Sequence, residues 1–468
     1  MPTCLIFSPP VQSIPNFATA TALITLFGKR GIITFHLLGA DHNIYGLQGL
    51  TIVLAMTFAP VAYLNIRGMF ENMDPSHFEA AASLGARPLQ TLFKVTIPMT
   101  IPALLASFLV LFVEGIADLA NPLVLGGDYR VLASQIYFAV AGGGDVASAA
   151  GIALVLLVPA ISVFAVQKYW AGKKTVITVT GKPTGTVKPV TARTVKYPVL
   201  LLVGVWVALV LACYTAILVG GFVKILAVDN SWTLDHYQFV YRLGADAVTK
   251  TLMMTLIATP IAALLALLIA WLVVRHLPRA GRILDFVGML GIAVPGTVLG
   301  LGFALAYSGP TWFLGHRILP PLAGGLATGA GAVSIIMVYI ARAIPTGQQA
   351  CISALKQINP QVEEASTSLG ASQITTLRLI TLPLLRSGVV TAMTYGITKS
   401  MTMITAIIFI TTPQTKVMTA QILDEVDAGH FGNAFAYCTV LIVLVLIVLA
   451  IASLAINQLN RSMRTAQS

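Results

Sequence analysis

The chain has 468 residues, of which 57% are hydrophobic and 10% charged, and its formal net charge is +11. Soluble proteins carry about 25% charged residues, so this composition excludes a water-soluble enzyme. The apolar residues fall in runs of about 20 or more, long enough to cross a bilayer. We therefore expect an all-α, polytopic transmembrane helical bundle embedded in lipid.

Ten membrane spans are predicted. In chain order they cover residues 5–27, 47–66, 99–117, 146–167, 198–223, 251–274, 286–307, 322–341, 387–412 and 431–456. The first is interrupted by three prolines, the third contains Glu114 and the ninth contains Lys399. Proline is tolerated inside membrane helices where neighbouring groups satisfy the freed carbonyls, so the first span is retained.

Lys and Arg residues gather between alternate spans. Segment 168–197 holds seven of them and no acidic residue, and such loops face the cytoplasm. Alternation places 64–98, 275–282, 342–386 and 461–468 on the same side, and the five segments together hold 19 of the 28 Lys and Arg residues. The positive charge is therefore an orientation signal and does not indicate a nucleic-acid partner.

The chain divides into two halves at its longest basic segment. We expect a first half at 1–167, a cytoplasmic linker at 168–197 and a second half at 198–468. The linker is rich in Lys, Thr, Gly and Pro, which is typical of an extended connector without a core.

The two halves contain a repeat at a fixed sequence offset of 285. The segment DPSHFEAAASLGARPLQTLFKVTIP (74–98) recurs as NPQVEEASTSLGASQITTLRLITLP (359–383), and 11 of the 24 positions over 75–98 are identical. The same offset pairs Pro60 with Pro345 in the preceding spans. A repeat of this length predicts two homologous halves.

Both copies resemble the motif EAA, three residues, Gly, nine residues, then Ile-x-Leu-Pro of the inner-membrane permeases of binding-protein-dependent ABC importers. The matching residues are Glu79, Ala80, Ala81, Gly85 and Pro98 in the first copy and Glu364, Ala365, Ser366, Gly370 and Pro383 in the second. The resemblance implies that each copy is a short helix–turn–helix that docks in a cleft of an ATPase subunit and couples it to the membrane helices. From the residues alone, small side chains permit close approach of another backbone and glycine permits a turn. The alternative is an ordinary amphipathic loop that packs on the protein's own cytoplasmic face.

The chain contains no P-loop. Its three Gly-Lys pairs, at 28–29, 172–173 and 181–182, are followed by Arg, Lys and Pro, where a P-loop requires Ser or Thr. We therefore expect no enzymatic activity and no cofactor bound by this chain. The resemblance implies that ATP and Mg²⁺ bind to a separate ABC ATPase subunit, present in two copies because the motif occurs twice.

The first half is shorter than the second. The stretch of chain from Pro198 to Glu364 is more than twice as long as the corresponding stretch from Met1 to Glu79. The difference leaves room for two spans, and the family pattern is six spans in each half. We therefore expect a truncated start, with four spans followed by six.

The segment EGIADLANPLVLGGDYRVLASQIYFA (114–139) is similar to a stretch of the ferric-iron-type permeases, a family of fused two-half proteins. Leu119 and Ala120 replace the Phe-Gly of that family. The resemblance implies a permease of the bacterial inner membrane that receives ferric iron from a periplasmic solute-binding protein. Related fused permeases carry phosphonates, polyamines or other small solutes, which remain the alternatives.

Four polar residues are candidates for the translocation path: Glu114, Asp118, Asn121 and Lys399. A charge in hydrocarbon costs about 2.5–3.5 kcal/mol on insertion scales, so such groups face a water-filled path or pair with each other. Glu114 and Lys399 occupy equivalent positions in the repeat, and an ion pair between them is preferred to a substrate contact. Solvation at the membrane edge is the alternative for Asp118. The seven histidines include no i, i+4 pair, so no metal site is predicted.

A secondary transporter is the alternative from another class, because such proteins also contain internal repeats and midplane charges. Here both copies of the repeat are predicted on the cytoplasmic side, and the best-matched segment is a loop, which favours an importer. An inert remnant of a decayed gene is a third hypothesis, supported only by the missing helices.

Overall fold

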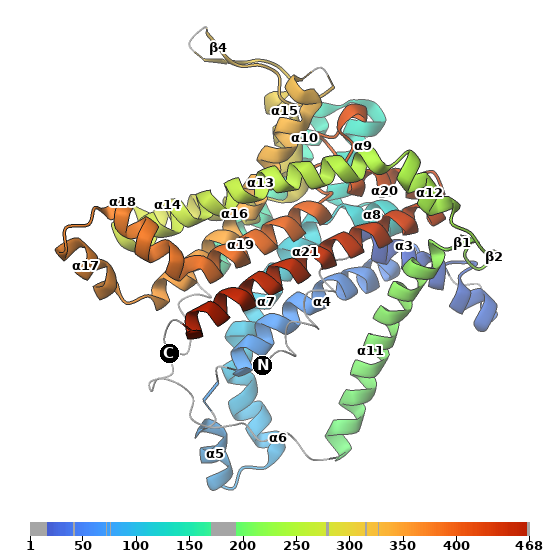
Figure 1. The fold of residues 1–468 in the computed structure, drawn as a ribbon. Coiled ribbons are helices and arrows are strands. Elements are labelled where there is room, and N and C mark those ends of the chain that lie inside the picture. The colour runs from blue at the N-terminus through green and yellow to red at the C-terminus, as the bar shows by residue number, and fades with distance from the viewer. Residues whose placement is uncertain are drawn as a thin grey trace. The chain divides into compact units, whose positions relative to one another are not determined.

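The computed structural model describes residues 16–40, 43–71, 73–74, 76–169, 193–277, 280–313, 316–325 and 327–465. The described chain is almost entirely helical (Figure 1). It forms two compact units that divide between Val219 and Gly220, with residues 16–18 counted in the second unit. Most of the expected linker at 168–197 lies outside the described residues, and the expected domain boundaries stay a prediction.

The first unit contains helices joined by turns and has no strand among its described residues. Its elements are α3 (Asn16–Phe27), η1 (Ile32–Leu37), α4 (Leu47–Glu71), α5 (Ser76–Ser83), α6 (Pro88–Thr91), η2 (Leu92–Thr96), α7 (Ile97–Ala117), α8 (Ala120–Leu125), α9 (Leu132–Gly143), α10 (Val146–Tyr169) and α11 (Arg193–Gly220).

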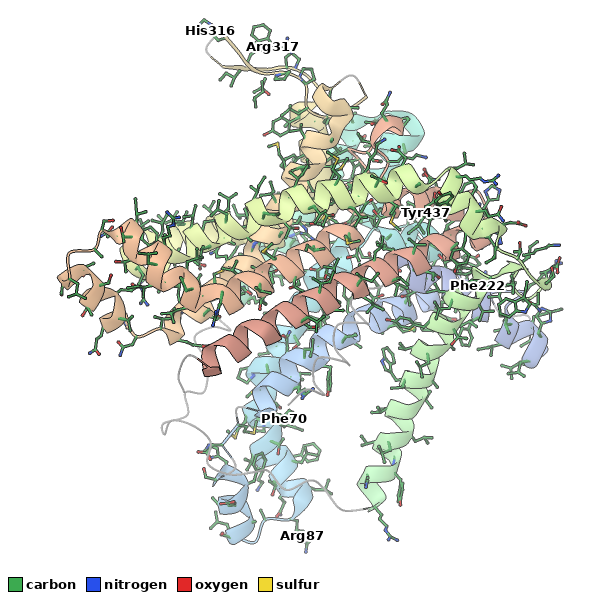
Figure 2. The ribbon with its side chains drawn as sticks, viewed as in Figure 1. Phe70, Arg87, Phe222, His316, Arg317 and Tyr437 are labelled. Atoms are coloured by element: carbon green, nitrogen blue, oxygen red, sulfur yellow. The ribbon has the colours of Figure 1, made fainter. Side chains whose placement is uncertain are left out.

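The second unit adds two short antiparallel hairpins, β1 with β2 and β3 with β4. Its elements are β1 (Val223–Ile225), β2 (Asp229–Trp232), α12 (Asp235–Arg242), α13 (Ala245–Trp271), η4 (Leu272–His276), α14 (Gly281–Ala293), α15 (Gly296–Tyr307), β3 (Thr311–Phe313), β4 (His316–Leu319), η5 (Thr328–Gly331), α16 (Ala332–Gln357), α17 (Pro360–Ser368), α18 (Gln373–Thr376), η6 (Leu377–Thr381), α19 (Leu382–Thr402), η7 (Pro413–Thr415), α20 (Met418–Asp427) and α21 (Phe431–Thr465). His316 and Arg317 project from the hairpin of β3 and β4 (Figure 2).

The predicted polytopic helical architecture is confirmed. Seven described helices are long and apolar enough to cross a membrane, and up to nine when each of two bent pairs is taken as one span. The seven are Leu47–Phe70, Leu89–Ala117, Val146–Gln167, Lys196–Gly220, Ala245–His276, Gly329–Gln357 and Phe431–Leu454. Of the expected first span 5–27, residues 16–27 form α3 and the preceding residues lie outside the described chain.

The predicted span 286–307 is not one straight helix. Helices α14 and α15 meet at 99°, and the chain between them is extended at Val294 (φ −85°, ψ 125°), the residue before Pro295. Proline disfavours the helical conformation in the preceding residue and has no N–H to continue the helix, which accounts for the bend.

Two other predicted spans have the wrong bounds. The span expected at 322–341 begins later, because Gly331 adopts φ 90° and α16 starts after it. The span expected at 387–412 ends with α19 at Thr402. The apolar run beyond Thr402 forms turns whose side chains Ile407 and Ile410 are buried in the protein core.

The predicted repeat is present in the backbone. At the offset of 285, α6 coincides with α18, η2 with η6 and α7 with α19, residue for residue. Four pairs of glycines at the same offset share a positive φ: Gly39 with Gly324, Gly46 with Gly331, Gly85 with Gly370 and Gly144 with Gly429. The two halves therefore repeat both the helices and the turns between them.

In the second unit, α13, α16 and α19 pack closely through small residues. A Cβ on Gly347 would lie 3.0 Å from the Cβ of Ala266 on α13 and 3.2 Å from that of Ala392 on α19. Small residues let membrane helices approach closely enough for extensive van der Waals contact. This packing holds the three helices of the second half side by side.

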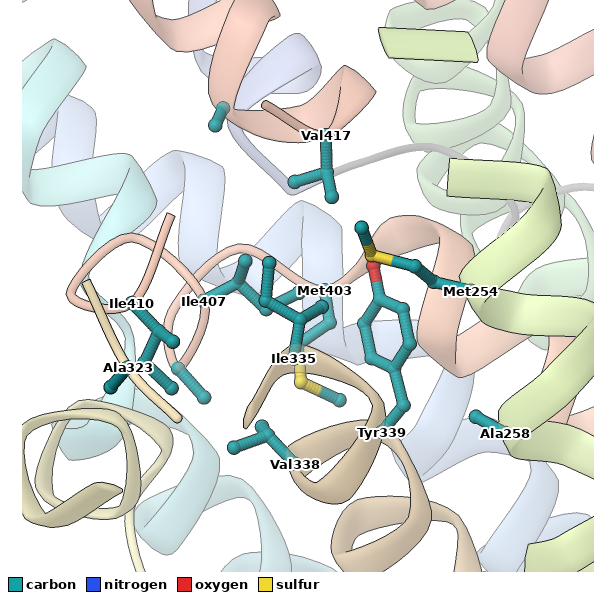
Figure 3. Packing of buried hydrophobic residues seen from close by; sticks show 12 residues of the cluster. Met254, Ala258, Ala323, Ile335, Val338, Tyr339, Met403, Ile407, Ile410 and Val417 are labelled. Atoms are coloured by element: carbon teal, nitrogen blue, oxygen red, sulfur yellow. The ribbon is translucent and has the colours of Figure 1, made fainter. Parts of the chain in front are cut away.

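A hydrophobic core lies between α13, α16 and the turns after α19 (Figure 3). Tyr339 and Ile335 of α16 are almost fully buried there against Met254 of α13 and Met403 and Ile407. The core fixes the turns that follow α19 against the spanning helices.

Replacing Gly300 by Ala is expected to destabilise the protein. A Cβ at this position would collide with the backbone carbonyl oxygen of Ala406, and such overpacking costs about 1–3 kcal/mol. Gly302, two residues further along α15, has open space around it, so Gly302→Ala is the matched control. Thermal unfolding in detergent measures both; an equal melting temperature for the two variants would contradict the packing of α15 on Ala406.

Candidate coupling loops and membrane path

The first coupling loop, residues 74–98, is a helix–turn–helix. Helix α5 ends at Ser83. Two residues later Gly85 adopts φ 74°, and the N–H of Ala86 donates to the carbonyl of Ala81 at 3.0 Å. Glycine favours this left-handed conformation because it has no Cβ. From α6 the chain continues through the π-helical turn η2 into α7, so the loop and its span form one continuous helix, Leu89–Ala117.

The second coupling loop, residues 359–383, has the same geometry. Gly370 adopts φ 87°, and the N–H of Ala371 donates to the carbonyl of Ser366 at 3.2 Å. Helix α18 continues through η6 into α19, but unlike the first loop's helix this one bends by 64° between Arg386 and Gly388. In both copies the backbone forms the predicted helix–turn–helix, with the glycine in the turn.

Polar side chains cap the loop helices. The carboxylate of Asp74 accepts from the N–H of Ser76 at 2.9 Å, and the amide oxygen of Asn359 accepts from the N–H of Gln361 at 3.0 Å. The hydrogen bonds from Ser76 hold the pKa of Asp74 below its usual range. Such caps satisfy N–H groups that have no partner inside the helix.

Only part of each motif faces outward. Glu79, Ala80, Glu364 and Ala365 are exposed, as are Pro98 and Pro383 near the start of the spanning helices. The second small residue of each motif, Ala81 and Ser366, is buried instead. Ser366 replaces the alanine expected there, and its hydroxyl lies 2.9 Å from the hydroxyl of Thr376 on α18.

Each loop also exposes large apolar side chains at equivalent positions. Leu84 is 87% exposed and its counterpart Leu369 is 90% exposed, and Leu89 and Ile374 form a second exposed pair. Figure 2 shows Arg87 pointing outward from the same turn of the first loop. Apolar side chains are therefore exposed at equivalent positions of both loops. Sequence reasoning missed these residues, although Leu84 and Leu369 are identical in the repeat.

Asp118 and Asn121 lie together at the end of α7 and the start of α8. The Asn121 amide donates to Asp118 Oδ2 at 2.7 Å, and Asp118 is only 3% exposed. The other carboxylate oxygen of Asp118 and the amide oxygen of Asn121 are buried without a hydrogen-bond partner among the described residues. Solvation at the membrane edge, the alternative for Asp118, is therefore not what the structure shows.

Glu114 and Lys399 lie on the equivalent helices α7 and α19, and both are partly buried. They belong to different compact units, so the ion pair between them stays a prediction. Within the part of the chain that the structure describes, no group of three or more His, Cys, Asp or Glu is placed to hold a metal ion.

Arg342 is a buried charge that the sequence analysis placed in a cytoplasmic loop. It lies inside the spanning helix Gly329–Gln357, and its Nη1 donates to the carbonyls of Gly291 at 2.8 Å and Val294 at 3.2 Å. These carbonyls end α14 at the bend, where a cation is favourable. The error followed from the misplaced bounds of the preceding apolar run.

A family model describing the inner membrane component of binding-protein-dependent transport systems matches residues 6–176 and 242–465. The ferric transport system permease protein FbpB of Actinobacillus pleuropneumoniae is 35% identical over 92% of this chain and 62% of its own length. A protein named as a ferric transport system permease, FbpB 1 of Haemophilus influenzae, is 34% identical over 86% of this chain and 63% of its own.

The chain thus spans less than two thirds of the length of these two relatives. Among solved structures, a bacterial ABC transporter involved in alginate import is similar, with a TM-score of 0.46, 17% identity, and coverage of 57% of this chain and 95% of that chain.

Replacing Asn121 by Leu is expected to destabilise the first unit by about 1–3 kcal/mol, because the buried Asp118 carboxylate loses a hydrogen bond and the apolar side chain cannot replace it. The double variant Asp118→Leu/Asn121→Leu removes both polar groups and is expected to be more stable than Asn121→Leu alone. Thermal unfolding compares the three proteins. A double variant less stable than Asn121→Leu would show that loss of the hydrogen bond between Asp118 and Asn121 does not cause the destabilisation.

Proposed function

The chain belongs to the inner-membrane components of binding-protein-dependent transport systems, and we propose that it forms the translocation path of an ATP-driven importer. A periplasmic binding protein delivers the solute, and a separate ABC ATPase, with ATP and Mg²⁺, supplies the energy. The observation that carries the proposal is the pair of matching loops. Each contains a glycine with a positive φ at its turn, preceded by an exposed leucine. The family match favours this over a secondary transporter.

The two loops are proposed to dock on two copies of the ATPase. The exposed face of each loop combines one carboxylate, Glu79 or Glu364, with the apolar pair Leu84 and Leu89 or Leu369 and Ile374. Apolar side chains fill a partner's pocket and exclude water, whereas the carboxylate supplies orientation. Because the first loop continues into the helix Leu89–Ala117, movement of its docked tip moves that helix as well. Movement of the second loop reaches the part of α19 beyond the 64° bend through the packing of α19 against α16.

Ferric iron is the proposed cargo. Support comes from the two named ferric permeases, which align over most of this chain, and from the segment 114–139. Asp118 and Asn121 present two buried oxygens without partners among the described residues, and oxygen is the ligand that hard cations prefer. We place these two residues on the path, with Glu114 and Lys399 as further candidates; phosphonates, polyamines and other small solutes are the alternative cargo.

Replacing Gly370 by Val is expected to uncouple ATP hydrolysis from uptake, whereas Gly370→Asn is expected to transport. Both side chains have room, since nothing lies within 4 Å of the Cβ position, but only Asn tolerates a positive φ. The left-handed conformation costs other residues about 1–2 kcal/mol, which lowers the population of the native turn about tenfold. We expect uptake per ATP to fall to a similar extent. Uptake and ATP hydrolysis in proteoliposomes measure the effect, and the same pair at Gly85 repeats the test in the first loop.

Equal uptake by the Val and Asn variants at both positions would refute the coupling assignment. Membrane-inserted yield is measured in parallel, because the proposal requires that the Val variants still reach the membrane.

A binding protein loaded with Fe³⁺ is expected to stimulate ATP hydrolysis by the reconstituted complex, because the solute is delivered on that protein. Binding proteins loaded with a phosphonate or a polyamine are the comparison, and stimulation by one of those alone would show that iron is not the cargo. In the same assay, Asp118→Leu/Asn121→Leu should retain stimulated hydrolysis and lose iron uptake. Normal uptake by that variant would remove the pair from the path.

A further inference from the structure

Arg275 lies in the last turn of η4, where the spanning helix Ala245–His276 ends beside the second coupling loop. Its Nε lies 3.0 Å from Glu363 Oε2 on α17. Its Nη2 donates to the carbonyls of Leu355 at 3.3 Å and Ile358 at 3.1 Å, at the end of α16. One guanidinium therefore joins the ends of α13, through η4, and α16 to the first helix of the coupling loop.

Glu363 extends this contact to a fourth element. Its second oxygen, Oε1, accepts from the hydroxyl of Thr381 at 3.0 Å, and Thr381 is the residue immediately before α19. The carboxylate thus binds the end of α13 with one oxygen and the start of α19 with the other. Both ends of the second coupling loop are fixed to the spanning helices through this one side chain.

A neighbouring contact holds the second helix of the loop. His276 Nε2 lies 3.2 Å from the amide oxygen of Gln373, the first residue of α18. The imidazole also packs against the Trp271 ring, with centroids 4.1 Å apart. The end of α13 therefore contacts both helices of the loop.

The ion pair is largely shielded from water. The side chain of Arg275 is 13% exposed and that of Glu363 is 17% exposed. Ion pairs that are shielded from water are screened less than exposed ones. The planar guanidinium places Nε beside Glu363 while Nη2 donates to the two carbonyls, an arrangement that the single ammonium of lysine does not reproduce.

The first coupling loop does not contain the same carboxylate. Position 363 corresponds to Phe78 at the offset of 285, whereas Thr381 corresponds to Thr96. The hydroxyl of Thr96 donates within its own helix, to the carbonyl of Thr91 at 3.3 Å. The two loops thus share their backbone and differ in how their first helix is attached.

From these contacts we propose that Arg275 is a positioning residue that makes the second coupling loop move as one body with α13, α16 and α19, through Glu363. The proposal rests on the proposed coupling function. It also makes the two ATPase docking loops mechanically unequal, because the first loop has no carboxylate at the corresponding position. Glu363 is distinct from Glu364, the acidic residue of the motif, which is exposed.

The test uses the reconstituted complex with its ATPase and binding protein. Arg275→Met and Glu363→Gln break the ion pair, Arg275→Lys keeps the charge without the fork, and Arg275→Glu/Glu363→Arg exchanges the two charges. Lys356→Met is the matched control, since it removes a positive charge from the exposed end of α16, where Lys356 makes no hydrogen bond or ion pair with the described residues.

Two quantities are measured: solute transported per ATP hydrolysed, and amide hydrogen exchange of residues 360–371 and 76–83. The Met, Gln and Lys variants are expected to bind the ATPase, to lower transport per ATP about two- to tenfold, and to speed exchange in 360–371 only. The exchanged pair should recover part of the loss, and Lys356→Met should match the unmodified protein. Arg275→Lys decides the result if Arg275→Met does not fold.

Unchanged exchange in 360–371, or an exchanged pair no better than the single variants, would overturn the inference. The valine variants of Gly85 and Gly370 separate this from the proposed function. If those variants transport normally, the coupling assignment itself is wrong. If they are uncoupled while the Arg275 variants are not, the coupling stands and the ion pair has no positioning role.

Discussion

In each half, a glycine in the left-handed conformation follows a short helix, and the next helix continues toward a membrane span. In the first half this helix is continuous from Leu89 to Ala117, whereas in the second half it bends by 64° between Arg386 and Gly388. Gly85 and Gly370 provide these turns, and a π-helical segment rather than a loop joins each second helix to its span. A displacement at the tip of the first loop would be transmitted along its continuous helix, whereas in the second half the 64° bend separates the loop from most of α19. In the second unit, the close packing of α13, α16 and α19 extends that displacement to the neighbouring spans.

Features that depend on local sequence could be predicted. The apolar runs, the internal repeat and the turn glycines indicated the type and order of most elements, because spacing and glycine act over a short stretch of chain. The bounds of the later spans were predicted wrongly because an apolar run indicates that side chains avoid water. It does not indicate whether they face lipid or the protein core. Ile407 and Ile410 continue the apolar run after α19, yet they pack in the core. The same ambiguity placed Arg342 outside the membrane.

The candidate site was predicted in part for a similar reason. The motif identified which residues form each coupling loop but not which side of the helix faces outward. That side is set by packing between α17 and α18, where Ser366 meets Thr376. Leu84 and Leu369 lie outside the named motif residues, and only the folded chain shows that they are exposed. The contact of Arg275 with Glu363 joins residues that lie far apart in the sequence, and no local pattern indicates it.

The equivalent positions of the two halves separate what is repeated from what is not. The backbone of the coupling loops and spans repeats, whereas several polar side chains occur in one half only. They are Asp118 opposite Met403, Asn121 opposite Ala406, Arg342 opposite Thr57 and Glu363 opposite Phe78. If the two loops dock on two copies of one ATPase, as proposed, they must be similar, which would account for the repeated backbone. A single small solute that passes along one path requires only one set of ligands. Polar side chains that line the path, or that attach one helix to another, can therefore differ between the two halves. On this argument, the positions where the halves diverge are where transport specificity and unequal movement of the two halves are expected to reside.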